Sequence, residues 1–169
     1  MLVRILGSTN TKAYILAKEV VEKCGCVVFH ESMEYIPGSE IDLNIAPLLT
    51  DKVPSDTLFE PRYGTLIFHP SPLPYGRGSA SIKFAYKRKE PITAATWFWA
   101  DLGLDTGNIC EQEILKIDHS VQPRLFYEKE VLPAMERTLE RCLNSLKIGL
   151  KREIKQVEKY SSFDRKKDL

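Results

Sequence analysis

The sequence contains no apolar run that approaches the ~20 residues needed by a membrane-spanning helix. It also lacks a strong charge of one sign, because 24 Lys and Arg residues stand against 23 Asp and Glu, a formal net charge of +1. Proteins that bind nucleic acid through its phosphates normally carry a clear basic excess, so no nucleic-acid partner is expected. The apolar stretch in the first ten residues is too short for a signal peptide, and we therefore expect a cytoplasmic protein without membrane contact.

Cysteine is scarce and scattered. Cys24 and Cys26 have the spacing of half a metal clip or of a redox pair, but no second pair and no clustered histidine completes it. We expect free, buried thiols and no metal site. The four cysteines are Cys24, Cys26, Cys110 and Cys142.

The length of 169 residues indicates one domain, and the opening of the chain has the pattern of a β-α-β unit. An apolar strand over 2–6 is followed by helical spacing over 11–24, which Gly25 ends, and by a second strand over 26–29. This unit builds parallel sheets. Further strands are expected over 42–46, 64–68, 94–100 and 109–117 (an edge strand), and helices over 54–59, 82–89 and 122–146. The predicted fold class is α/β: a Rossmann-like, open, mainly parallel sheet flanked by helices.

Two loops that follow predicted strands carry candidate chemistry. The first, His69-Pro-Ser-Pro-Leu-Pro74, is stiffened by proline, which would hold the imidazole outside the sheet in a fixed place. The second, 103–107, is by itself typical of a turn, but it contains Asp105. Ligands of open sheets bind where strands end, so we expect the histidine and the carboxylate at one rim, as a pair for general acid–base chemistry. Two other histidines lack such a setting and are expected on the surface: His30 and His119.

These loops belong to a longer string of motifs: Gly64-Thr-Leu-Ile-Phe-His-Pro-Ser-Pro-Leu-Pro74, then Arg77-Gly78, then Leu104-Asp-Thr-Gly107. The string resembles the catalytic domain of folate-dependent formyltransferases. That superfamily includes methionyl-tRNA formyltransferase, glycinamide ribonucleotide formyltransferase, sugar N-formyltransferases and the hydrolase domain of formyltetrahydrofolate dehydrogenase. The resemblance runs from about residue 42 to 147 and implies the formyltransferase fold, with 10-formyltetrahydrofolate as the formyl donor and no metal.

The resemblance also implies roles for individual residues. His69 and Asp105 match the family's catalytic histidine and aspartate, and Ser71 would support His69. The family's catalytic asparagine falls on Ile67, which cannot donate a hydrogen bond to an oxyanion, and the loss of one such donor typically costs ~100-fold or more in rate. An apolar residue there, and the run Phe98-Trp-Ala-Asp101, are similar to the formyltetrahydrofolate dehydrogenase branch.

Further contacts are implied by the same resemblance. The family's folate pocket maps onto Pro47, Leu48, Leu49, Thr50, Phe98, Ala100, Asp101 and Gly103. The substrate would be contacted by Arg77 and Gly78, and a phosphate could bind the first βα turn, formed by Gly7, Ser8, Thr9 and Asn10. The simpler interpretation of that turn is a plain helix N-cap by Ser8, Thr9 or Asn10.

Family members carry roughly one more βα unit where only the short 31–40 stretch stands here, so the chain is expected to be a compact variant or a domain cut from a larger protein. Residues 1–150 would form the catalytic domain, and 151–169 a basic, solvated tail or the start of a further module. The function implied is formyl transfer to a small primary amine, such as a nucleotide-linked amino sugar. The alternatives are 10-formyltetrahydrofolate hydrolysis and a folate-binding domain with weakened catalysis.

Overall fold

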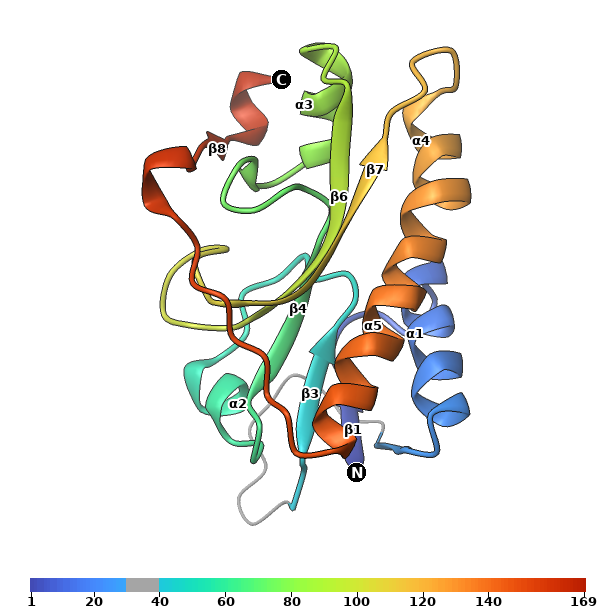
Figure 1. Cartoon of the computed structure of the whole chain (residues 1–169), viewed down its shortest axis with the longest axis vertical. Helices are drawn as coiled ribbons and strands as arrows, with labels where there is room; N and C mark the ends of the chain where they lie inside the picture. Colours follow the sequence, from blue (N-terminus) through green and yellow to red (C-terminus); the bar gives the residue numbers. More distant parts are fainter. Residues whose placement is uncertain (30–39) are drawn as a thin grey trace.

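The computed structural model describes residues 1–29 and 40–169. His30 and all but the last residue of the short 31–40 stretch lie outside the described residues. Within these limits the predicted α/β architecture is confirmed: a central sheet has helices packed on it, and the C-terminal segment crosses the sheet on the side away from the long helix (Figure 1).

The central sheet has six strands in the order β2-β1-β3-β4-β6-β7. The first four are mutually parallel, whereas β6 runs antiparallel to β4 and β7 antiparallel to β6, so the sheet is mixed and mainly parallel. As predicted, the strand that begins after residue 108 forms one edge of the sheet. In spatial order the strands are β2 (Val27–Phe29), β1 (Leu2–Ile5), β3 (Leu43–Ala46), β4 (Thr65–His69), β6 (Ile92–Trp99) and β7 (Ile109–Lys116).

The helices largely follow the predicted pattern. The segment expected to be one long helix is helical from 123 to 147, but it contains a π-helical stretch between two α-helical parts. The helices are α1 (Lys12–Lys23), α2 (Ser55–Phe59), α3 (Ser81–Lys87), α4 (Pro123–Phe126), the π-helix η1 (Tyr127–Val131), α5 (Leu132–Lys147) and two short 3₁₀-helices, η2 (Glu158–Tyr160) and η3 (Lys166–Asp168).

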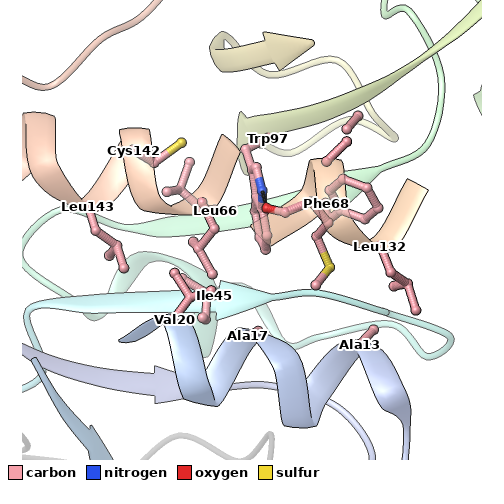
Figure 2. Packing of buried hydrophobic residues seen from close by; sticks show 14 of the residues in the cluster. Ala13, Ala17, Val20, Ile45, Leu66, Phe68, Trp97, Leu132, Cys142 and Leu143 are labelled. Carbon is pink, nitrogen blue, oxygen red and sulfur yellow. Dashed lines mark hydrogen bonds between the residues drawn. The ribbon is translucent and has the colours of Figure 1, made fainter. Parts of the chain in front are cut away.

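The main hydrophobic core lies between one face of the sheet and the pair α1 and α5. Figure 2 shows Ala17 of α1 facing the sheet residues Ile45 and Leu66, with Trp97 of β6 and Leu143 of α5 nearby. Trp97 is fully buried, and its indole N–H donates to the carbonyl of Met135 at 3.1 Å, so the largest core side chain also leaves no orphaned donor.

The opposite face of the sheet carries the candidate site. Because side chains alternate along a strand, Leu66 and Phe68 of β4 point into the main core, while Ile67 and His69 point to the other side. Ile67 accordingly packs in two small clusters of its own, one with Ala46 and one with Leu73 and Phe98. This face is covered by loops, by α2 and by the C-terminal segment.

The C-terminal segment is anchored at several points. Ile154 forms an isolated antiparallel bridge with Ile109, and the short strands β5 (Arg77–Gly78) and β8 (Phe163–Asp164) pair in parallel. Gln156 is only 4% exposed and Asp164 only 6%. At these points the segment 151–169, which the sequence suggested as a solvated tail, is packed against the sheet domain.

Three expectations from composition concern the described part of the chain. Its four cysteines are free and buried, as predicted. Among the described residues no group of three or more His, Cys, Asp or Glu side chains has the placement needed to hold a metal ion. Nor does any helix in that part combine the length and apolar character required to cross a membrane.

Candidate functional site

His69 is the last residue of β4 and is 8% exposed. Its Nε2 lies 2.7 Å from the carbonyl oxygen of Gly76 and 3.0 Å from the hydroxyl oxygen of Ser81. A carbonyl oxygen can only accept a hydrogen bond, so the proton of the neutral ring must sit on Nε2. The other nitrogen, Nδ1, is then the one that can take up or release a proton.

Asp105 lies in the loop between β6 and β7 and faces that free nitrogen. Its Oδ2 is 4.0 Å from His69 Nδ1, and the two side chains are 12% and 10% exposed. The same oxygen accepts the backbone N–H of Gly78 at 2.7 Å. Asp105 has a φ of +56°, a left-handed conformation that aspartate adopts more readily than most residues. The structure thus brings the predicted pair together on one side of the sheet.

The route by which the two residues meet differs from the prediction of a shared rim. Because β6 is antiparallel to β4, Thr96 pairs with His69 while Trp99 pairs with Leu66, so β6 ends near the start of β4. The N–H of Ala100 donates to the carbonyl of Thr65 at 2.8 Å, which fixes the start of the loop there. The loop must therefore fold back along the face of the sheet to place Asp105 beside the histidine.

Ile67, at the position of the family's asparagine, lies two residues before His69 and shares its face of β4. It pairs with Ala46 on one side and with Phe98 on the other, and it is partly buried against Leu73. This apolar surrounding suits isoleucine, which offers no hydrogen-bond donor beside the His–Asp pair.

The predicted support of His69 by Ser71 is not made. The Ser71 hydroxyl is buried without a hydrogen-bond partner among the described residues, and the backbone carbonyl of Ser71 instead accepts from Thr96. Ser81, the first residue of α3, contacts the imidazole. Its helix begins at Ser81 itself, with Ala80 in the left-handed conformation at the N-cap. No signal in the sequence distinguished Ser81 from its neighbours.

Arg77 and Gly78, which follow the proline-rich loop and were predicted to touch substrate, both form hydrogen bonds to other residues of the protein. Gly78 donates its N–H to Asp105. Arg77 is 6% exposed and directs its guanidinium into the protein, where it bonds Gln156 at 2.8 Å and Glu158 at 2.6 Å. The hydrogen bond from Arg77 lowers the pKa of the Glu158 carboxyl. Arg77 is thus committed to the C-terminal segment.

The predicted folate segments lie on both sides of β4 in the sheet. After β3, Leu48 is 40% exposed, whereas Pro47 is buried. After β6, the exposed Asp101 ties its own loop by accepting from the N–H of Gly103 at 2.9 Å and from the hydroxyl of Thr106 at 2.7 Å. Of the remaining predicted positions, Leu49 and Ala100 are partly buried, Thr50 is exposed and Phe98 is buried.

The first βα turn, 7–10, abuts one of those segments. A Cβ added to Gly7, whose φ is +109°, would lie 2.9 Å from the carbonyl oxygen of Leu48, so the close approach of the two backbones requires glycine. Ser8, Thr9 and Asn10 are exposed. The N-cap of α1 is Thr11, whose side chain accepts from the N–H of Tyr14 at 3.2 Å, so a cap by any of those three residues is not formed.

Comparison with known proteins gives consistent relatives. A family model described as "Formyl transferase" matches residues 16–133. Cytosolic 10-formyltetrahydrofolate dehydrogenase of Xenopus tropicalis is 28% identical over 134 residues, which cover 79% of this chain and 15% of that protein. The chain therefore spans a small part of the length of this relative.

Solved structures agree in fold. HypX from Aquifex aeolicus in complex with tetrahydrofolic acid superposes with a TM-score of 0.79 at 20% identity, covering 98% of this chain and 29% of that one. The formyltransferase PseJ from Anoxybacillus kamchatkensis, in complex with UDP-4,6-dideoxy-4-formamido-L-AltNAc and tetrahydrofolate, superposes with a TM-score of 0.75 at 19% identity, covering 99% and 87%.

Fold and site together define an α/β protein with a histidine–carboxylate pair on the loop-covered face of a mixed sheet. With the family match over residues 16–133, the chain belongs to the formyl transferase family.

Proposed function

We propose that this chain transfers the formyl group of 10-formyltetrahydrofolate to a primary amine of a small acceptor. The observation that carries the proposal is the placement of His69 Nδ1 4.0 Å from Asp105 Oδ2, with both side chains largely shielded from water. An amine that bonds to the formyl carbon must lose a proton, and the departing folate nitrogen must gain one. A histidine with one free ring nitrogen beside a carboxylate can serve both needs.

The proposed division of labour follows from the contacts. Gly76 and Ser81 hold the Nε2 side of the ring, so proton exchange is assigned to Nδ1. Asp105 would stabilise the imidazolium that forms when Nδ1 takes up the proton, because an opposite charge nearby favours the charged state. Gly78 keeps the Asp105 carboxylate directed at the ring.

Folate as the donor is supported by the relatives, one of which is named for 10-formyltetrahydrofolate and two of which are solved with a form of tetrahydrofolate. The loop after β6 also carries large apolar side chains on its surface, Leu102 at 88% exposed and Leu104 at 58%. Exposed leucines in a predicted ligand loop suit contact with the ring faces of a folate, whose aminobenzoyl ring is apolar.

For the acceptor we propose an amino sugar linked to a nucleotide. PseJ, which matches nearly the whole chain in fold, is solved with a UDP-linked formamido sugar. A formal net charge of +1 argues against tRNA, whose phosphates call for a basic surface.

Hydrolysis of 10-formyltetrahydrofolate is the second candidate, and Ile67 favours it. An apolar residue replaces the amide donor that the family pattern places there, and the relative at 28% identity is a formyltetrahydrofolate dehydrogenase. A third possibility, a folate-binding domain with weakened catalysis, would follow from the same loss of a donor.

The test is the release of tetrahydrofolate from 10-formyltetrahydrofolate, followed by absorbance with and without a panel of nucleotide-linked amino sugars. Release that requires an amine supports the transferase. Equal release without amine supports the hydrolase. Folate binding without release in either case would support the binding domain and reject both enzymes.

A further inference from the structure

Gln156 occupies an unusual position in the C-terminal segment. It is 4% exposed, and its side chain reaches under the loop that carries Asp105. Its Nε2 donates to the carbonyl oxygen of Asp105 at 2.9 Å and to that of Gly107 at 2.7 Å. Its Oε1 accepts from Nε and Nη2 of Arg77 at 3.2 and 2.8 Å.

Every hydrogen-bonding capacity of this amide is used, and its orientation is fixed by its partners. A guanidinium can only donate and a carbonyl oxygen can only accept, so Oε1 must face Arg77 and Nε2 must face the loop. Buried, fully satisfied polar networks of this kind hold a unique geometry, because any rearrangement leaves a buried group unpaired.

The loop needs such a support. Asp105 has a left-handed backbone, and its neighbours Leu102 and Leu104 are exposed, so little hydrophobic burial restrains this part of the chain. Among the described residues, two hydrogen bonds hold Asp105 from outside the loop: the N–H of Gly78 donates to its carboxylate and the Gln156 amide donates to its carbonyl. Since Arg77 orients Gln156, both supports originate in the same short strand, β5.

We propose that Gln156 is a positioning residue for Asp105: together with Arg77 it fixes the backbone of the loop so that the carboxylate faces His69. The proposal assigns part of the site's support to the segment 151–169, outside the 1–150 region expected to contain the catalytic domain. Its effect on turnover rests on the proposed function, whereas its effect on the geometry of the loop does not.

Two variants separate the roles of the amide. Gln156→Glu keeps an acceptor for Arg77 but turns the donor that faces the two carbonyls into a carboxylate oxygen, which repels them. Gln156→Met removes the donor without adding charge. The matched control is Glu158→Gln: Glu158 also bonds Arg77, but its side chain is 65% exposed and has no contact with Asp105 in the described structure.

The first measurement is hydrogen exchange at the Gly78 amide, whose acceptor is Asp105 Oδ2. Exchange should become about fivefold faster in both Gln156 variants, as expected when a hydrogen bond of about 1 kcal/mol is lost, and should be unchanged in Glu158→Gln. Unchanged exchange in folded Gln156→Glu and Gln156→Met would overturn the proposal, whether or not the protein turns over folate.

The second measurement is steady-state turnover. Displacement of a catalytic group by about 1 Å can cost about 100-fold, so kcat should fall by that order with an unchanged KM for the donor. In an Asp105→Asn background, Gln156→Glu should have no further effect on kcat. Equal losses in both backgrounds would show that Gln156 does not act through Asp105 and would overturn the proposal. A wild-type chain without turnover would reject the proposed function and leave the exchange experiment to decide on Gln156.

Discussion

The Nδ1 of His69 lies 4.0 Å from Oδ2 of Asp105, a carboxylate oxygen that already accepts the N–H of Gly78 at 2.7 Å. The separation is longer than a hydrogen bond, so the ring and the carboxylate are neighbours, and Nδ1 makes no hydrogen bond to the described residues. The opposite ring nitrogen is held by Gly76 and Ser81. The histidine is thereby fixed on one side and available on the other.

Ser81→Ala removes the hydroxyl contact on His69 Nε2 and should lower kcat by about fivefold, because one hydrogen bond that orients the ring is worth about 1 kcal/mol. Ser71→Ala is the matched control, since the buried Ser71 hydroxyl makes no hydrogen bond in the described structure. It should leave kcat unchanged and leave the thermal midpoint unchanged or raised. Initial rates for the two variants at saturating donor decide the matter, and a larger loss in Ser71→Ala would contradict the site as described.

Ile67→Asn restores the residue type of the family pattern next to His69. We expect tetrahydrofolate release to rise by about 100-fold, the typical value of one oxyanion donor, because the same oxyanion forms whether an amine or water attacks the formyl carbon. The amide would be partly buried near Phe98, at a cost in stability of about 1–3 kcal/mol. Ile67→Val controls for altered packing. The release rates with and without amine are the measurement, and rates equal to those of Ile67→Val would show that an amide at this position does not act as an oxyanion donor.

The carboxylate of Glu113 on β7 bonds Arg137 at 2.6 Å and Arg141 at 2.9 Å. The hydrogen bond from Arg137 is the main cause that lowers the pKa of Glu113 below 4.5. A carboxyl group whose pKa is lowered on folding stabilises the protein at pH values above its unfolded-state pKa. That stabilisation is lost as the pH falls through the folded-state pKa.

Wild-type stability should therefore decline below about pH 4.5 more steeply than that of Glu113→Gln. At pH 7 the free energies of unfolding of wild type and Glu113→Gln should differ by about 1 kcal/mol or less, because both arginines are about half exposed. Urea unfolding at a series of pH values measures it. Glu153→Gln, at a pair of exposed groups 3.7 Å apart, should behave like wild type. Parallel pH profiles for wild type and Glu113→Gln would refute the assignment.

Gly107→Ala tests how tightly the loop is packed. An added Cβ would overlap the backbone carbonyl of Trp99, which cannot move aside. We therefore expect the free energy of unfolding to fall by about 1–3 kcal/mol and the turnover of the donor to be reduced. Gly149 has a φ of +81° and nothing lies within 4 Å of an added Cβ, so Gly149→Ala should lower the free energy of unfolding by only about 1 kcal/mol. Thermal unfolding compares them, and equal midpoints would contradict the close contact at Gly107.

Motif and pattern carried the sequence analysis a long way. The parallel β-α-β opening, the edge strand and the meeting of His69 with Asp105 were predictable because each has a local signature: alternation, a helical period or a motif. The direction of β6 was not, since an apolar strand has the same pattern whether it runs parallel or antiparallel to its neighbour. The fold-back of the loop after Trp99 follows from that direction.

Contacts between distant segments were also beyond the sequence. Ser81 was not predicted because it lies outside the motif that pointed to Ser71, and a hydroxyl has no sequence pattern that reveals its partner. Gln156 lies 51 positions from Asp105, in a charged segment whose composition is typical of a solvated surface. Only the folded chain places its amide beneath the loop.

The most direct test of the central claim is tetrahydrofolate release from 10-formyltetrahydrofolate, at saturating donor and with the best amine acceptor, by wild type, His69→Ala and Asp105→Asn. His119→Ala is the control, because this exposed histidine bonds only the carbonyl of Glu90 among the hydrogen bonds described. Loss of a positioned acid–base group typically costs about 100- to 10,000-fold, so both site variants should lose release by that order while the control retains it. Release that survives in folded His69→Ala and Asp105→Asn would contradict the assignment of catalysis to this pair.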